Sequence, residues 1–193
     1  MKYFHKNMEL EVPEGVYYPR EDSELLAKVL DGAKLKDKKT LEIGCGSGFL
    51  SILMAKKGAI VSAVDINPIA VETTKANARK NSAELDCFFS EMFDNVTKKY
   101  DLLVFNPPYL PVSDEDIEDI TYSGGSSGRE IIEVFLGNAA TYLNPKGKLL
   151  LFIASLTDEA EVLSLVKEAG FKAKIKAREK IDWEELIVLG LQG

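Results

Sequence analysis

Histidine and cysteine are scarce in this sequence of 193 residues, which contains one histidine, His5, and two cysteines, Cys45 and Cys87. Structural zinc sites take about four Cys or His ligands at close spacing, so we expect no metal site in this chain. Two scattered cysteines make no disulfide framework, and the default expectation is a reduced, cytoplasmic protein. Catalysis through a histidine base or a cysteine nucleophile is also disfavoured, since few residues could perform it.

Long apolar runs are also absent. No stretch approaches the roughly 20 apolar residues that a membrane-spanning helix needs, and residues 1–6 lack the apolar stretch of a signal peptide. Acidic residues outnumber basic ones, and the net charge of −7 repels phosphate groups on average. We therefore expect no membrane association, and we expect a protein substrate or a basic partner rather than direct nucleic-acid binding.

Strand-like and helix-like patterns alternate along the chain, which predicts an α/β fold. We expect a Rossmann-like, seven-stranded, mostly parallel sheet with one antiparallel strand and helices on both faces. A single domain is expected over residues 1–193, with an N-terminal helical segment over about 1–36 leading into the sheet. A turn is predicted at 144–147, and the acidic, then Gly- and Ser-rich segment 114–127 predicts a long functional loop. The predicted strands cover 40–43, 60–64, 85–89, 100–105, 148–154, 171–177 and 185–191.

A glycine-rich turn, EIGCGSG at residues 42–48, follows the first of these strands. Gly48 comes one position too early for the dinucleotide pattern G-x-G-x-x-G, and Glu42 would repel a pyrophosphate but suits a ligand with a cationic amino acid part. Asp65 ends the next strand, where a carboxylate can accept hydrogen bonds from both ribose hydroxyls. The register of Glu42, Gly44, Gly46 and Asp65 favours this ligand over NAD and over a turn that binds nothing.

This pattern resembles class I S-adenosylmethionine-dependent methyltransferases. The resemblance implies their fold, S-adenosylmethionine as cofactor and S-adenosylhomocysteine as product. It also implies that Glu91 and Met92 contact the adenine, although the commoner pair in the family is Asp-Leu. Cys45, within the turn, is expected to be a small filler rather than a nucleophile, because no activating His or Lys is near it in the sequence.

The tetrapeptide Asn106-Pro107-Pro108-Tyr109 follows a strongly apolar strand, at the edge where parallel sheets place their active sites. An amide or aromatic amine nitrogen is a poor nucleophile because its lone pair is delocalised. The side-chain oxygen of Asn106 and the carbonyl of Pro107 can accept its two N–H groups and stabilise the positive charge that develops during methyl transfer. Both prolines restrict the backbone, and Tyr109 can stack on a planar target group. We therefore predict that these residues bind the substrate and catalyse N-methylation.

Four segments together, residues 16–23, 42–48, 106–109 and 124–130, resemble HemK-type protein-glutamine methyltransferases. These enzymes modify the Gly-Gly-Gln motif of class-1 translation release factors. The chain is similar to the archaeal and eukaryotic branch, which lacks an added N-terminal domain. In that branch the cofactor contacts match Ser23, Glu42, Gly44, Asp65, Glu91, Met92 and Asn106.

The resemblance leaves some roles open and implies a partner. Tyr17 and Asp22 could contact the cofactor, or they could only cap and pack the first helix. Residues 124–130 could form a substrate-side wall or a loop leading into a helix. Members of the branch work as heterodimers with a small zinc-binding activator protein, and we expect it to bind strand 85–90, where Cys87 and the two following phenylalanines are more apolar than an edge strand should expose.

Two other functions use the same features. A DNA or RNA amino-methyltransferase would hold an adenine or guanine exocyclic amine with the same tetrapeptide, but the net charge and the lack of a target-recognition domain disfavour it. An inactive cofactor-binding subunit would not need Asp65, Asn106 and Tyr109 together. The sequence therefore favours methylation of a glutamine amide.

Overall fold

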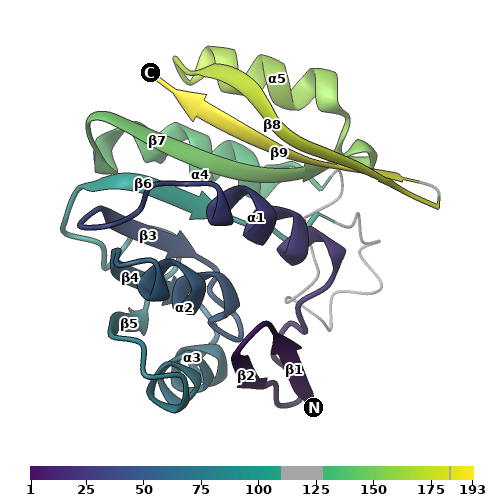
Figure 1. The fold of residues 1–193 in the computed structure, drawn as a ribbon. Coiled ribbons are helices and arrows are strands. Elements are labelled where there is room, and N and C mark those ends of the chain that lie inside the picture. The colour runs from purple at the N-terminus through teal and green to yellow at the C-terminus, as the bar shows by residue number, and fades with distance from the viewer. Residues whose placement is uncertain (110–127, 183) are drawn as a thin grey trace.

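The computed structural model describes residues 1–109, 128–182 and 184–193, and its centre is a seven-stranded sheet (Figure 1). The strands lie in the order β5-β4-β3-β6-β7-β9-β8. Strand β9 runs antiparallel to both of its neighbours, and the pairs on the other side of β7 are parallel. This confirms the predicted sheet. The strands are β3 (Lys39–Ile43), β4 (Ile60–Asp65), β5 (Leu85–Phe89), β6 (Tyr100–Phe105), β7 (Leu143–Ala154), β8 (Lys172–Ile181) and β9 (Glu184–Gln192).

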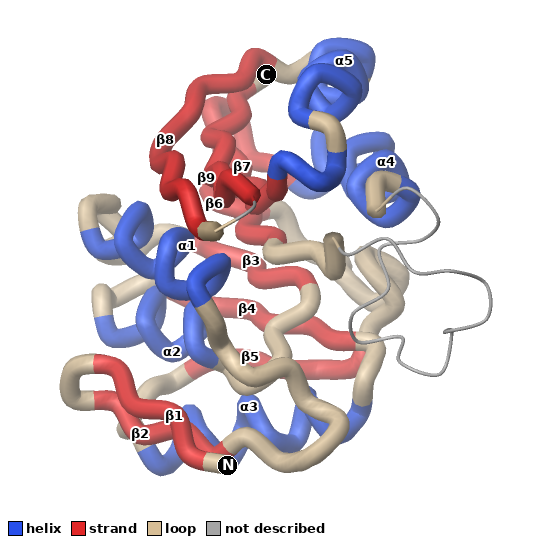
Figure 2. The backbone as a smooth tube through the Cα atoms, turned by 90° about the vertical axis from the view of Figure 1, so that its right-hand side faces the viewer, coloured by secondary structure: helices blue, strands red, loops and turns tan. Residues whose placement is uncertain are grey.

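Helices cover both faces of the sheet, as predicted. Figure 2 shows α1 and α2 on one side and α4 and α5 on the other. A hydrophobic core lies on each face of the sheet, and alternate side chains of the central strand β6 point into one or the other. Leu102 and Val104 pack with α1 and α2, whereas Leu103 and Phe105 pack with α4 and α5. Burial on both faces explains why this strand is almost wholly apolar. The helices are α1 (Glu21–Asp31), α2 (Phe49–Lys56), α3 (Pro68–Lys80), α4 (Glu130–Ala139) and α5 (Glu159–Glu168), with short 3₁₀ turns η1 (Ala140–Tyr142) and η2 (Ser155–Thr157).

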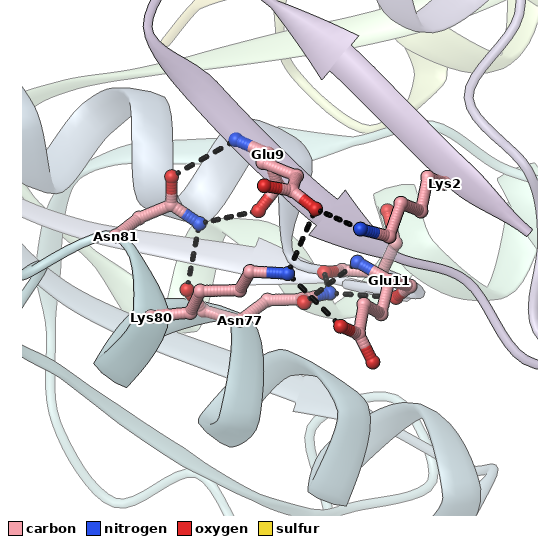
Figure 3. Close-up of polar contacts among 7 residues, drawn as sticks. Lys2, Glu9, Glu11, Asn77, Lys80 and Asn81 are labelled. Carbon is pink, nitrogen blue, oxygen red and sulfur yellow. Dashed lines mark hydrogen bonds and ion pairs between the residues drawn. The ribbon is translucent and has the colours of Figure 1, made fainter.

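The N-terminal segment corrects one prediction. A helical segment was expected over about 1–36; α1 is the helix of this segment, but an antiparallel hairpin of β1 (Lys2–His5) and β2 (Met8–Glu11) precedes it. Buried Tyr3, Met8 and Leu10 alternate with more exposed residues, which is the period of a strand rather than of a helix. The hairpin lies against α3 (Figure 3).

The predictions for two further segments have different outcomes. The turn predicted at 144–147 is an irregularity inside β7, where pairing with β6 moves from Tyr100–Leu143 to Leu102–Lys148. Lys146 has a positive φ of 66° there, so the chain bulges and then resumes its pairing. The predicted functional loop at 114–127 lies outside the described residues. Among the helices of the described ranges, none has the length and apolar character needed to cross a membrane.

Candidate functional site

One cavity of about 820 Å³ opens at the carboxyl ends of β3, β4 and β6. Every predicted site residue lines it. The glycine-rich turn, the end of β4, the segment after β5 and the tetrapeptide after β6 meet there, as expected for the active edge of a parallel sheet. The predicted residues on its wall are Ser23, Glu42, Gly44, Gly46, Asp65, Glu91, Met92, Asn106, Pro107, Pro108 and Tyr109.

The glycine-rich turn needs its glycines for two reasons. Gly44, Gly46 and Gly48 have positive φ angles of 68°, 53° and 82°, which L residues with a side chain rarely adopt. A Cβ on Gly48 would also lie 2.9 Å from the Thr74 hydroxyl oxygen on α3. The turn is therefore tightly packed against α3, and its residues 42–47 line the cavity.

Asp65 ties this turn to the end of β4. Its two carboxylate oxygens accept hydrogen bonds from the backbone N–H groups of Gly46, at 2.8 Å, and Asn67, at 2.9 Å. Burial raises the pKa of the Asp65 carboxyl, and these backbone donors oppose that rise. Each carboxylate oxygen keeps a second lone pair, so the group can still accept bonds from ligand hydroxyls.

Glu42 lies at the other end of the turn and is only 3% exposed. The hydroxyl of Ser51, on α2, donates a hydrogen bond to its carboxylate. Burial raises the pKa of Glu42 to about 8, and the bond from Ser51 only partly offsets this. A cationic group placed beside Glu42 would favour its ionised form. The residue is thus suited to an ammonium ligand, as predicted from its position.

The segment after β5 is organised by a residue that the sequence analysis missed. Ser90 is 1% exposed; its hydroxyl donates to the carbonyl of Met92, at 3.1 Å, and accepts the backbone N–H of Asn95, at 3.0 Å. These bonds shape the turn that presents Glu91 and Met92 to the cavity. A serine at a strand end is a common turn residue, so only its burial distinguishes it here.

The side-chain amide of Asn106, in the tetrapeptide, has one end paired and one end unpaired among the described residues. The side-chain nitrogen of Asn106 donates to Asp22, with an Nδ2–Oδ2 distance of 2.6 Å. Its side-chain oxygen is buried and has no hydrogen-bond partner in the described part of the chain. Buried polar atoms are normally paired, so an unpaired acceptor at a cavity wall indicates a place for an incoming N–H donor.

Tyr109 is packed in place by its neighbours. Its ring lies 5.2 Å from the ring of Phe152, centroid to centroid. Burial, and then the nearby carboxylate of Asp22, raise the pKa of its hydroxyl. Tyr109 is therefore a neutral aromatic surface at the cavity and does not act as a base at neutral pH.

Part of the predicted segment 124–130 is described, from Gly128 onward. A Cβ on Gly128 would lie 2.5 Å from the carbonyl oxygen of Tyr109, so glycine is needed for this close approach. Arg129 donates to the carbonyl of Thr157 at 3.3 Å. The described end of this segment therefore packs against the tetrapeptide, while residues 124–127 lie outside the described ranges.

The residues present fit S-adenosylmethionine. The carboxyl group of Glu42 can pair with the ammonium group of this cofactor. The carboxylate of Asp65 can accept hydrogen bonds from its ribose hydroxyls. Glu91 and Met92 offer a polar and an apolar side chain to its flat base. In the described ranges, no group of three or more His, Cys, Asp or Glu side chains is arranged to hold a metal ion.

Known proteins resemble this chain in sequence and in fold. A family model described as the methyltransferase small domain matches residues 15–180, which defines the class of protein as a methyltransferase. A protein described as an N5-glutamine methyltransferase of Methanocaldococcus jannaschii is 43% identical over 189 residues, covering 95% of each chain. Human methyltransferase HEMK2 is 30% identical over 188 residues, covering 90% of this chain and 88% of HEMK2.

A solved structure adds to these relatives. It is the Mtq2–Trm112 complex of E. cuniculi, which is described as responsible for methylation of the eRF1 translation termination factor. It superposes with a TM-score of 0.76 at 26% identity, covering 92% of this chain and 98% of that chain. The chain belongs to the HemK-type methyltransferase family, in the branch that contains HEMK2 and Mtq2.

Proposed function

We propose that this protein transfers a methyl group from S-adenosylmethionine to the glutamine side-chain amide of the Gly-Gly-Gln motif in a class-1 translation release factor. Relatives described as glutamine methyltransferases support the reaction, and the eRF1-methylating complex supports the substrate. The observation that carries the proposal is the buried, unpaired oxygen of Asn106 beside Pro107. Two adjacent acceptors match the two N–H groups of a primary amide.

Each residue of the tetrapeptide has its own role in the proposed reaction. When bound, S-adenosylmethionine would supply an electrophilic methyl group, and its S–C bond would break as the new N–C bond forms. Asn106 Oδ1 and the Pro107 carbonyl accept the amide N–H groups, hold the nitrogen in line and stabilise its developing positive charge. Tyr109 offers an aromatic surface to the planar amide. The extra proton on nitrogen passes to water, so the step needs no basic side chain.

One assay tests the substrate directly. The protein, with and without a candidate activator, is incubated with methyl-labelled S-adenosylmethionine and a release factor, or the same factor with the motif glutamine replaced. We expect label only in the unmodified factor. Label in both factors, or in neither, contradicts the glutamine assignment.

Asn106→Ala tests the role of the acceptor. We expect turnover to fall by about a hundredfold or more, the usual loss when a residue that stabilises transition-state charge is removed. Cofactor affinity, measured by calorimetry with S-adenosylhomocysteine, should change only a few fold. An equal loss of turnover and affinity would show that Asn106 serves the cofactor rather than the substrate nitrogen.

We also propose a heterodimer with a small zinc-binding activator, docked at the edge strand β5. The structure revises the surface expected there, because Cys87 is buried and Phe88 is half-buried. Phe89 is 51% exposed, and Ile66 and Ile69 near the end of β4 are 47% and 52% exposed. The sheet edge and these side chains together suit a partner that adds a strand and covers apolar surface. Mtq2 of E. cuniculi is found in a complex with a second protein, Trm112.

The docking proposal predicts that Phe89→Asp prevents co-purification with the activator. Phe4→Asp is the matched control, since Phe4 is 65% exposed but lies on the distant hairpin. Phe88→Asp combined with Phe89→Asp extends the test across the strand. Co-purification that survives both β5 variants would place the partner elsewhere.

The proposal has further implications. A release-factor methyltransferase acts where translation ends, which implies a cytoplasmic protein. We treat residues 1–193 as one methyltransferase domain, since α1, the hairpin and the sheet contribute to a common core. A DNA or RNA amino-methyltransferase remains the alternative, and the assay above separates it because such an enzyme would label neither release factor.

A further inference from the structure

An asparagine side chain can present either an acceptor or a donor to a ligand, and the two ends have almost the same shape. For Asn106 this choice matters, because a target nitrogen carrying two hydrogens needs an acceptor. A reversed amide would place its own NH₂ group against the substrate NH₂ group and repel it. Something in the protein must therefore determine which end of Asn106 is left free.

Asp22 makes that choice through direct contact. Its Oδ2 accepts a hydrogen bond from Asn106 Nδ2 at 2.6 Å, and the Ser23 hydroxyl oxygen is a longer acceptor for the same nitrogen at 3.5 Å. Reversing the amide would bring Asn106 Oδ1 as close to the carboxylate, and two acceptors at that distance repel. The contact keeps the NH₂ end occupied and leaves the carbonyl oxygen unpaired.

Asp22 is itself held firmly. It is 3% exposed and lies in the first turn of α1, whose buried leucines pack into the core. Its second oxygen, Oδ1, accepts the hydroxyl of Tyr17 at 2.9 Å. Helix capping does not account for Asp22, because the N-cap is Arg20 and the carboxylate bonds the Tyr17 and Asn106 side chains.

We propose that Asp22 is a positioning residue: it fixes the orientation of the Asn106 amide so that Oδ1 receives the substrate N–H. This inference rests on the proposed transfer to an amide nitrogen. The negative charge beside the NH₂ end also polarises the amide and increases electron density on Oδ1. The acceptor is therefore stronger where positive charge develops on the substrate nitrogen.

The contact itself can be tested without any substrate. In protein labelled with ¹⁵N-asparagine, the side-chain amide signal of Asn106 is assigned by its loss in Asn106→Ala. We expect slow solvent exchange and a hydrogen-bonded proton shift in the wild type, and loss of both in Asp22→Leu, which has a similar size and no acceptor. An Asn106 signal that is unchanged in Asp22→Leu overturns the inference, whatever the substrate proves to be.

Kinetics then test the consequence of the contact. Asp22→Asn should lower kcat by about tenfold to a hundredfold, the range for a lost hydrogen bond to a charged group. The affinity for S-adenosylhomocysteine and the melting temperature should stay close to wild type. Glu21→Gln is the matched control, because it removes the neighbouring exposed charge without touching Asn106, and its kcat should equal that of the wild type.

A double variant that exchanges the two residues gives the most specific test of the contact. Asp22→Asn combined with Asn106→Asp lets the introduced amide at position 22 donate to the introduced carboxylate at position 106. One carboxylate oxygen then remains free as an acceptor, so kcat should recover above both single variants. No recovery, or a loss of kcat in Asp22→Asn that parallels a loss of melting temperature, would reduce Asp22 to a packing role. An inactive wild type would instead contradict the proposed substrate and leave the amide signal to decide the inference.

Discussion

Burial controls the chemistry of Glu42 more than its hydrogen bonds do. The carboxyl is 3% exposed, and its pKa is raised from 4.5 to about 8. Near neutral pH the free protein therefore holds a largely neutral acid at a position suited to an ammonium ligand. Binding that ligand should drive off the proton, because an adjacent cation favours the carboxylate.

This linkage predicts a pH dependence of cofactor binding. Affinity for S-adenosylhomocysteine should rise as pH increases from about 6 to 8, and the rise should stop near 8, where Glu42 is already ionised. Calorimetry in two buffers of different ionisation enthalpy should detect the released proton. Glu42→Gln should bind more weakly with a flatter profile, and a wild-type profile as flat as that of the variant would contradict the prediction.

The same shift affects folding with the opposite sign. Between pH 4.5 and about 8 the folded state keeps a proton that the unfolded state has lost, so stability falls as pH rises. The slope from one such group is at most about 1.4 kcal/mol per pH unit. Urea titrations of the wild type and Glu42→Gln should differ in this slope, and equal slopes would show that Glu42 is ionised in the folded protein.

Some residues of the site were predictable from the sequence, whereas one contact between them was not. Glu42, Asp65 and Asn106 were predictable because each lies at the carboxyl end of an apolar strand or directly after it, and these strand ends meet at one edge of the sheet. The contact between Asp22 and Asn106 joins residues 84 positions apart. Its pairing depends on how α1 packs against the sheet, which the local pattern around Asp22 does not contain.

At the scale of elements, the N-terminal hairpin is held to α3 by two asparagine side chains (Figure 3). Asn81 pairs with both backbone groups of Glu9, and Asn77 pairs with both backbone groups of Glu11. Asn77 also donates to the carbonyl of Ser47, at 2.9 Å. The hairpin, α3 and the glycine-rich turn are therefore joined through one amide.

The two asparagines make a matched pair of variants. Asn77→Ala should loosen both the hairpin and the turn, because it removes both bonds to the Glu11 backbone and leaves the Ser47 carbonyl unpaired in a buried position, which costs about 1–3 kcal/mol. Asn81→Ala should loosen the hairpin alone. Hydrogen exchange of residues 8–11 should rise in both variants, and affinity for S-adenosylhomocysteine should fall in Asn77→Ala. If Asn81→Ala lowers affinity equally, the bond to Ser47 is not what supports the turn.

The hairpin was missed in the sequence for a physical reason. A two-stranded ribbon of this length is marginal in isolation and depends on what it packs against. Its support comes from Asn77 and Asn81, which are far along the chain and read locally as ordinary polar helix residues. The sheet strands were easier to predict, since their apolar runs reflect burial on both faces.

At the scale of the whole molecule, the net charge of −7 bears on what can approach the cavity. Non-specific nucleic-acid binding relies on neutralising several phosphates with Lys and Arg, and an acidic protein lacks the average potential for it. Excess RNA should therefore leave the rate of release-factor methylation unchanged near physiological salt. Inhibition that weakens steeply as salt is added would reveal a phosphate-binding surface and favour the nucleic-acid alternative.

The two thiols make the molecule well suited to site-specific labelling. Cys45 and Cys87 are the two cysteines of the chain, both are buried, and their sulfur atoms lie 3.8 Å apart. Their mutual contact and burial raise the pKa of Cys45, so its thiol stays protonated and unreactive toward maleimides. Glu84→Cys would therefore introduce a readily modified thiol at an exposed position just before β5, with Phe89 left in place. A fluorophore attached there would follow binding of the second protein in real time, in otherwise native sequence.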